Sequence, residues 1–162
     1  MTITFESCVQ NAPQRLEYAS ALKALETILR GLPPVIIAID GKVGVGKTTL
    51  GRFLAWRFNI TLLETDLYFA ESTATFEYFE YKVEEAKRVI EARFNRNRPI
   101  IVEGVEARKL LAEANLEPKF VIRVTCNQAE GTPTTNKLWQ QYARQYPDLK
   151  EGYLLLDLPA ID

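Results

Sequence analysis

The chain has 162 residues, 20 of them basic and 21 acidic, for a formal net charge of −1, and it contains no histidine. A nearly neutral chain creates no global field that would attract nucleic acid or an anionic membrane surface, so we expect neither as a partner. Without histidine, imidazole-based triads and imidazole metal ligands are excluded, and any chemistry falls to carboxylates, lysines, hydroxyls and a bound ion.

The composition is that of an ordinary globular protein. Hydrophobic residues make up 47% of the chain and charged residues 25%, and the length suits one domain over residues 1–162 that buries its own core. No apolar run reaches the roughly 18 residues of a membrane span, and the first ten residues carry no leader-like pattern. Cys8 and Cys126 lie far apart in the sequence, a pattern typical of cytosolic thiols rather than of a disulfide framework. We therefore expect a cytoplasmic protein. The sequence does not indicate the oligomeric state.

The first predicted element is a helix of about residues 13–30. Apolar residues recur through it at helical spacing, and Gly31 followed by Pro33 and Pro34 gives a stop signal. Residues 35–39, VIIAI, then form a short apolar run rich in β-branched side chains. Such a run is typical of a strand buried on both faces of a parallel sheet.

Helices and strands then alternate along the chain. We expect helices at 48–58, at 75–94, through Leu111 and Ala114, and at 136–145, with strands at 60–63, 99–102, 120–124 and 153–156. In the helix at 75–94, the predicted apolar face consists of Phe79, Val83, Ala86, Ile90 and Phe94. This alternation predicts an α/β fold with a mostly parallel sheet. Residues 127–136 form the most loop-like stretch after the glycine-rich one.

The glycine-rich stretch GKVGVGKT, residues 41–48, matches the phosphate-binding pattern G-x-x-x-x-G-K-[ST] between a buried strand and a helix. Glycines let backbone N–H groups approach phosphate oxygens, and the following helix presents its positive dipole end. Lys47 adds a charge for the β- and γ-phosphates, and the Thr48 hydroxyl suits Mg²⁺. We therefore predict phosphate contacts from Gly41, Lys42, Val43, Gly44, Val45, Gly46, Lys47, Thr48 and Thr49, although Lys42 also fits a solvated loop residue.

Asp66 follows the second predicted strand in the segment ETDLYF. Ligands bind at the carboxyl ends of strands in parallel α/β sheets, which aims Asp66 at the γ-phosphate side of a nucleotide. A carboxylate there can take a proton from an attacking hydroxyl or orient water bound to Mg²⁺. The alternative is a helix or turn cap. Glu64, closer to the strand, is expected to be structural.

Glu103 directly follows the third predicted strand in the segment RPIIVEGVEA. A carboxylate at this point of the sheet helps to organise Mg²⁺, and the alternative is an ordinary acid at a strand end. Glu106 is a candidate to support it. The predicted metal ligands are thus Thr48, Glu103 and Asp66.

Three segments together, VIIAIDGKVGVGKTTLGRFLAWRF, LLETDLYF and IIVEGV, resemble the uridine kinase-like group of P-loop small-molecule kinases. The resemblance covers about residues 32–107. It implies a P-loop NTPase three-layer sandwich, with a five-stranded sheet in the order 2-3-1-4-5 and helices on both faces. It also implies ATP and Mg²⁺ as cofactors and a small-molecule hydroxyl, such as that of a nucleoside, as acceptor. Lys47 and Thr48 would bind the phosphates and Mg²⁺, Asp66 would be the base, and Glu103 would hold metal or acceptor.

The chain departs from this group after the fourth predicted strand, where such kinases carry an arginine-rich lid. Arg123 lies inside the strand, and residues 125–145 after it offer only Lys137 and Arg144. We select Arg144 as the lid-type catalytic arginine, against the alternative of a solvated helix face. The segment after Asp66 is short, and its aromatic residues are candidates either for the acceptor pocket or for the core: Tyr68, Phe69, Phe76 and Tyr78.

Other classes of nucleotide-binding protein remain open. A GTPase normally has the motif N-K-x-D, whereas residues 136–139 read NKLW. A nucleotide sensor or a catalytically degenerate kinase relative fits the sparse lid, while Asp66 and Glu103 argue for catalysis. A kinase for a sugar acid or a cofactor precursor is the other alternative, because the P-loop core is shared and a fold does not settle function.

Overall fold

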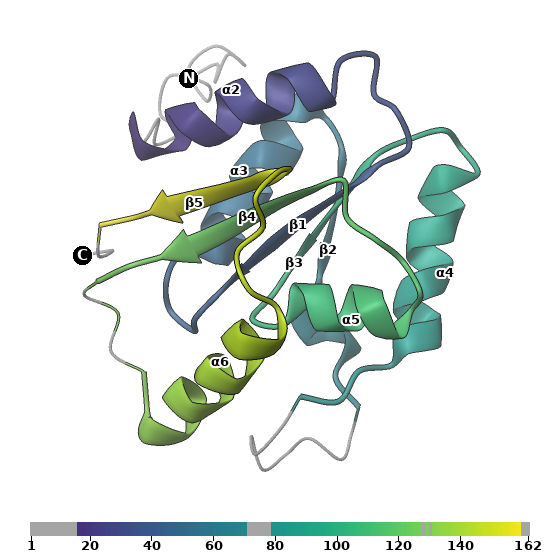
Figure 1. The fold of residues 1–162 in the computed structure, drawn as a ribbon. Helices are drawn as coiled ribbons and strands as arrows, with labels where there is room; N and C mark the ends of the chain where they lie inside the picture. The colour runs from purple at the N-terminus through teal and green to yellow at the C-terminus, as the bar shows by residue number, and fades with distance from the viewer. Residues whose placement is uncertain (1–15, 71–78, 128, 130, 160–162) are drawn as a thin grey trace, which may run out of the picture.

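A computed structural model describes residues 16–70, 79–127, 129 and 131–159. Its centre is one five-stranded parallel sheet in the order β2-β3-β1-β4-β5 (Figure 1). The strands are β1 (Ile36–Gly41), β2 (Thr61–Glu64), β3 (Ile100–Glu103), β4 (Phe120–Thr125) and β5 (Tyr153–Asp157). The sheet confirms both the predicted α/β class and the predicted strand order.

Helices cover both faces of the sheet, as predicted. They are α2 (Ala19–Ile28) after a short 3-10 turn η1 (Leu16–Tyr18), α3 (Lys47–Phe58), the 3-10 turn η2 (Thr65–Tyr68), α4 (Val83–Phe94), α5 (Ala107–Glu113) and α6 (Pro133–Gln145). Among the described residues, no helix is long and apolar enough to cross a membrane.

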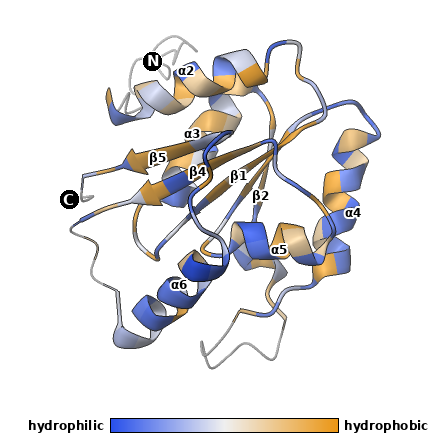
Figure 2. Cartoon of the chain, viewed as in Figure 1, coloured by the Kyte–Doolittle hydropathy of each residue, from blue (hydrophilic) through white to orange (hydrophobic). Residues whose placement is uncertain are grey.

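The core consists of two apolar clusters, one on each face of the sheet. Successive side chains of a strand point to opposite faces, so Ile37 and Ile39 of β1 pack with α2 and α3, while Ile36 and Ala38 pack with α4 and α5. The strands are accordingly mostly hydrophobic, and polar residues gather on the outer helix faces (Figure 2). This arrangement forms the three-layer sandwich and leaves the carboxyl ends of β1, β2 and β3 at one edge.

The prediction of a helix over 75–94 is wrong at its start. Residues 75–78 lie outside the described part of the chain, and α4 begins only at Val83. Phe79 is buried, but it belongs to an extended segment rather than to a helix face. The backbone of Tyr81 forms an antiparallel bridge with Phe69, and the Lys82 N–H donates to the Tyr68 carbonyl at 2.7 Å. These tertiary hydrogen bonds replace the helical ones that the apolar spacing predicted.

The last helix begins at Pro133 rather than at Asn136, inside the stretch predicted as a loop. The Thr132 side chain accepts a hydrogen bond from the Thr135 N–H at 3.2 Å and caps the helix. Proline is favourable in the first turn, because its missing N–H would lack a helical partner there. The residue types that predicted a loop here therefore mark the start of a helix.

Candidate functional site

The glycine-rich loop connects β1 to α3 and takes a conformation that depends on its glycines. Gly44 and Gly46 have φ values of +78° and +91°, a region that side-chain-bearing residues rarely adopt. A Cβ on Gly41 would overlap the Val124 carbonyl of the neighbouring strand. The loop therefore stays close to the sheet and turns directly into the N-terminus of α3, where unpaired N–H groups face outward.

Lys47 is the first residue of α3 and lies almost fully buried under the loop. Its Nζ donates to the Lys42 carbonyl at 2.6 Å, so the loop folds around the ammonium group. Burial lowers the pKa of Lys47, and the nearby charges of Glu103, Asp66 and Asp40 oppose this. The Lys47 ammonium thus lies at the point where the motif places phosphates, near carboxylates that favour its charged form.

Thr48 and Glu103 meet at the carboxyl end of β3. The Thr48 hydroxyl donates to Glu103 Oε1 at 2.9 Å. Glu103 is 2% exposed, and its second oxygen, Oε2, has no hydrogen-bond partner among the described residues. Burial raises the pKa of Glu103, while Thr48 and Lys47 partly offset that effect. A buried carboxylate oxygen without a partner, beside a hydroxyl, is the kind of hard donor that Mg²⁺ takes.

The donor set fits a magnesium ion that depends on the nucleotide for its other ligands. In the described part of the chain, no three acidic or thiol side chains gather as a self-sufficient metal site. Mg²⁺ bound with phosphates usually keeps several waters and takes only one or two protein ligands. Thr48 and Glu103 would hold it in that way.

Asp66 and Glu64 follow β2 but have different surroundings. Asp66 is exposed in η2, and its charge acts on both Lys47 and Glu103, so the fold brings it to the same edge. Glu64 instead accepts from Arg52 of α3 through both oxygens, at 2.7 and 3.0 Å. This bidentate pair supports the structural role expected for Glu64, and it leaves Asp66 as an exposed carboxylate at the same edge of the sheet.

A buried polar network that sequence reasoning did not single out lies beneath the loop. Arg123 of β4 donates from Nε and Nη2 to the two oxygens of Asp40, at 3.0 and 2.9 Å, and from Nη1 to Asp148 at 2.7 Å. The Tyr142 hydroxyl of α6 donates to Asp40 at 2.7 Å. Asp40 and Arg123 are register partners on adjacent strands. The sequence offered one signal for this pair: an acidic residue in the apolar run of β1 and a basic residue in that of β4. The signal is useful only when the two strands are known to be neighbours.

The network explains why Arg123 does not serve as a free cation. Arg123 also donates to the Tyr146 carbonyl at 2.8 Å, and its guanidinium lies 5.2 Å from the centre of the Trp139 ring. Arg144 is exposed in the last turn of α6. Because it follows Tyr142 by two residues, or about 200° around the helix, it projects away from the side that contacts Asp40. Its role as a lid arginine stays a prediction.

The aromatic candidates divide between the core and the undescribed segment. Tyr68 and Phe69 are partly buried and pack on the α4–α5 side of the core. Phe69 stacks on Phe79 and Tyr81, with ring centres 5.1 and 5.3 Å apart. Phe76 and Tyr78 lie outside the described residues. Phe69 is thus a core residue that fixes the segment leading to Tyr81.

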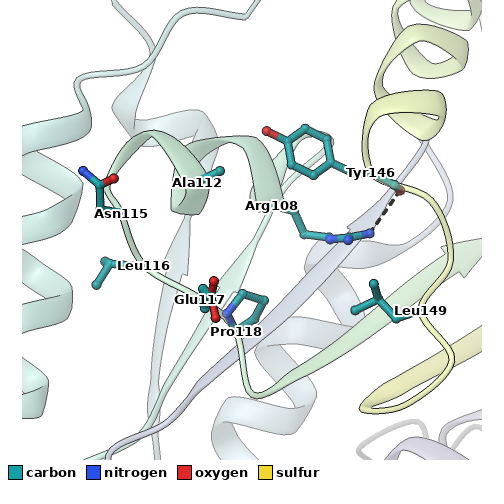
Figure 3. Close-up of a pocket in the computed structure, with 8 residues that line it drawn as sticks. All are labelled: Arg108, Ala112, Asn115, Leu116, Glu117, Pro118, Tyr146 and Leu149. Atoms are coloured by element: carbon teal, nitrogen blue, oxygen red, sulfur yellow. Dashed lines mark hydrogen bonds between the residues drawn. The ribbon is translucent and has the colours of Figure 1, made fainter.

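A separate pocket of about 620 Å³ lies along α5 (Figure 3), and no residue of the glycine-rich loop lines it. Arg108 projects into it from α5, and its Nη1 donates to the Tyr146 and Pro147 carbonyls at 3.0 and 2.9 Å. None of the predicted site residues lines this pocket. Arg108 thus links α5 to the chain that follows α6. The predicted chemistry belongs to the site at the glycine-rich loop instead.

Comparison with known proteins identifies the fold. A structure described as a possible uridine kinase from Bacillus stearothermophilus matches with a TM-score of 0.57 and 14% identity, covering 85% of this chain and 100% of that one. A sugar kinase from a Janibacter species matches with a TM-score of 0.52 and 17% identity, over 78% of this chain and 86% of that one. No family model matches the sequence, and no curated protein does. The chain therefore has the P-loop kinase fold, as the resemblance implied.

Proposed function

We propose that this protein is an ATP- and Mg²⁺-dependent kinase that transfers the γ-phosphoryl group to a hydroxyl of a small metabolite. The observation that carries the proposal is the unpartnered buried oxygen of Glu103, held beside Thr48 at the head of a phosphate-binding loop. A glycine-rich loop alone would bind phosphate, but a buried carboxylate in this position adds the means to organise a cation for phosphoryl transfer. The fold neighbours, described as kinases, support the same class.

The first proposed role belongs to the loop and Lys47. Backbone N–H groups at the start of α3 would hold the β- and γ-phosphates, and Lys47 would leave the Lys42 carbonyl to pair with them. When bound, Mg²⁺ would supply positive charge across the same phosphates. Catalysis of this kind is mainly positioning and electrostatic stabilisation of a transfer whose covalent chemistry is simple.

The second proposed role belongs to Asp66. Its carboxylate would accept the proton of the acceptor hydroxyl as that oxygen attacks the γ-phosphorus. The bond from the γ-phosphorus to the bridging oxygen breaks, and ADP leaves with the electron pair. Asp66 suits this part because it is exposed, while its charge reaches Lys47 and Glu103. The activity would take place in the cytoplasm, the location expected from the sequence.

A nucleotide-binding protein without transferase activity is the second candidate. It is favoured by one observation: Arg123, the arginine of β4, is committed to Asp40 and Asp148, and Arg144 projects to solvent. Neither of these two arginines is therefore free to stabilise the transferred group as a lid arginine would, and Lys47 would carry more of the transferred charge.

The test is ADP formation from Mg²⁺-ATP across a panel of nucleosides, sugars, sugar acids and cofactor precursors. Lys47→Ala should abolish acceptor-dependent turnover, because it removes the charge beside the transferred group. Lys23→Ala, which removes an exposed lysine of α2, is the matched control and should keep wild-type turnover. ATP binding that needs Lys47, together with no acceptor-dependent ADP in the whole panel, would favour the non-catalytic candidate.

A further inference from the structure

The Asp40 carboxylate is a buried negative charge at the base of the glycine-rich loop. Asp40 is fully buried, and Gly41, the first residue of the loop, follows it. Burial lowers the pKa of Lys47, and the charge of Asp40 is one of three that oppose this effect. A carboxylate that acts on an ammonium group in this way competes with phosphates for it. An ion pair between the two would use the charge that the proposed function assigns to the nucleotide.

Lys47 and Asp40 are nevertheless not paired. In the described part of the chain, no carboxylate forms an ion pair with Lys47. The lysine Nζ donates instead to the Lys42 carbonyl at 2.6 Å. This carbonyl is a neutral acceptor within the loop, and hydrogen bonds to a charged acceptor such as a phosphate are stronger. The ammonium group is therefore available to a phosphate, and the reason lies in the groups that hold the Asp40 carboxylate.

Among the described residues, three hydrogen bonds hold this carboxylate, and all of them come from β4 and α6. Arg123 donates from Nε to Asp40 Oδ1 at 3.0 Å and from Nη2 to Oδ2 at 2.9 Å. The Tyr142 hydroxyl donates to Oδ2 at 2.7 Å. The guanidinium fork fixes both oxygens in one plane, and the hydroxyl adds a third donor. The charge of Asp40 is thus compensated without any hydrogen bond from Lys47.

The two faces of the sheet separate these donors from the lysine. Asp40 and Ala38 are alternate residues of β1 and therefore project from the same face. Ala38 belongs to the same apolar cluster as Leu138 of α6, whereas α3, which begins at Lys47, packs into the cluster on the opposite face. In Figure 1, α6 lies beside the carboxyl end of the sheet. The donors from β4 and α6 thus draw the carboxylate toward α6 and away from α3.

Both donors are themselves fixed in the state that they need. Burial and the charge of Asp40 raise the pKa of Tyr142, so its hydroxyl keeps the proton that it donates. Arg123 also donates from Nη1 to Asp148 at 2.7 Å, and the Tyr153 hydroxyl donates to the same Asp148 oxygen at 2.6 Å. Asp148 and Tyr153 therefore belong to the network without touching Asp40, which makes Tyr153 a matched control for Tyr142.

We propose that Arg123 and Tyr142 are positioning residues for nucleotide binding: they hold Asp40 away from Lys47 and so keep the ammonium group free for phosphates. The inference rests on the proposed function, because a free Lys47 matters only if the loop binds a nucleotide. When a donor is lost, the buried carboxylate loses part of its compensation, which is strongly unfavourable. The carboxylate then pairs with Lys47, and the nucleotide has to break that pair in order to bind.

The first test compares the two tyrosines of the network. Tyr142→Phe removes a hydrogen bond to Asp40, whereas Tyr153→Phe removes one to Asp148. The dissociation constant of Mg²⁺-ATP is measured by isothermal calorimetry, well below the unfolding midpoint of each protein. Tyr142→Phe should raise this constant by about 5- to 10-fold, the change that corresponds to one lost hydrogen bond, and Tyr153→Phe should keep the wild-type value. Equal constants in Tyr142→Phe and the wild type would overturn the proposal.

The second test uses Asp40→Asn to separate positioning from stability. An amide keeps the shape of the carboxylate but has no charge that attracts Lys47. Added to Tyr142→Phe, Asp40→Asn should return the ATP dissociation constant to within about twofold of the wild-type value, although it weakens the contact with Arg123 and lowers the urea midpoint further. A purely structural network predicts the reverse, because each lost contact would then weaken ATP binding more. A double variant that binds ATP more weakly than Tyr142→Phe alone would contradict the positioning role.

The outcomes separate this inference from the proposed function. Failure of the wild-type protein to bind Mg²⁺-ATP would overturn the proposed function and the positioning role with it. ATP binding that depends on Lys47 but is equally strong in Tyr142→Phe would overturn the positioning role alone. If Asp40→Asn does not fold, the comparison of Tyr142→Phe with Tyr153→Phe decides the question, since each of these variants removes only one hydroxyl group.

Discussion

At the scale of one residue, Glu103 has a buried carboxylate that is only half satisfied by the protein. One carboxylate oxygen accepts from Thr48, while the other is buried with no hydrogen-bond partner in the described chain. Burial raises its pKa, which means that the folded protein resists the charged form. Such a group lowers the stability of the free protein and is retained where a ligand later satisfies it.

Replacing this carboxylate should therefore stabilise the protein at neutral pH. In the window between the ordinary glutamate pKa of about 4.3 and the raised pKa of Glu103, the native state holds a proton that the unfolded state has released. The free energy of unfolding then falls as pH rises through that window. Glu103→Gln lacks this loss, so its urea midpoint should exceed that of the wild type at pH 7 and match it at pH 3.5. A lower midpoint at pH 7 would show that the charged form is already satisfied.

Asp66 leads to the opposite expectation, because it is exposed. Asp66→Asn should lower kcat by about 100- to 10,000-fold, the usual contribution of a general base, while the ATP dissociation constant stays at the wild-type value. The free energy of unfolding should change by no more than about 0.5 kcal/mol. Steady-state kinetics and isothermal calorimetry measure the two effects. Unchanged kcat would remove Asp66 from the role of base.

At the scale of elements, α6 is fastened to the sheet through buried charge rather than through a large apolar face. Only Leu138 and Tyr142 of α6 are buried among its described side chains. Tyr142 and the Tyr146 carbonyl after the helix end reach Asp40 and Arg123, respectively. Because Asp40 directly precedes the glycine-rich loop, the position of α6 and the base of the loop depend on the same carboxylate.

Breaking this ion pair on one side should be costly. Arg123→Leu leaves Asp40 as an uncompensated buried charge and should lower the free energy of unfolding by about 3–5 kcal/mol. The double variant Asp40→Leu with Arg123→Leu removes both charges and should recover much of that loss. Urea unfolding measures the wild type, the single variant and the double variant. A double variant no more stable than Arg123→Leu alone would contradict the cost of an unpaired buried charge.

Arg144→Ala is the matched control on the same helix. The residue is exposed, so stability should change by no more than about 0.5 kcal/mol. The same variant tests the lid prediction, in which loss of this arginine lowers kcat without changing the urea midpoint. Wild-type kcat would remove Arg144 from the catalytic set.

At the scale of the whole molecule, nucleotide binding should stabilise the fold. Mg²⁺-ATP at about 100 times its dissociation constant adds about 2.7 kcal/mol to the free energy of unfolding. For a chain of this size that corresponds to a rise in Tm of roughly 5–10 °C. A thermal melt should show the rise in the wild type, a smaller one after chelation of Mg²⁺, and none in Lys47→Ala. An equal rise in Lys47→Ala would place the nucleotide elsewhere.

The sequence predicted what depends on local pattern and missed what depends on neighbouring strands. Apolar runs and the glycine-rich loop identified all five strands and, through the resemblance, their order. The backbone pairing of Phe69 with Tyr81 lay beyond it, because a bridge across an intervening segment overrode the helical spacing that includes Phe79. Asp40 and Arg123 were missed for the same reason, since their pairing follows from strand order rather than from spacing.

The unpartnered oxygen of Glu103 was also beyond the sequence. Asp66 and Glu103 can be selected because each follows a strand, but nothing in the spacing shows that one oxygen of Glu103 is buried without a hydrogen-bond partner in the described chain. Burial without a hydrogen bond is a property of the packed chain. It is visible only when the surroundings of each side chain are known.

The Asp40–Arg123 pair also has a consequence for synthesis on the ribosome. Arg123 lies 83 residues after Asp40, and Tyr142 lies 102 residues after it. Until those residues emerge, β1 cannot take its buried place without leaving a bare carboxylate in an apolar surrounding, which is strongly unfavourable. We therefore expect β1 to be buried only after β4 and α6 have been synthesised. The glycine-rich loop would then bind phosphate only after most of the protein has been translated.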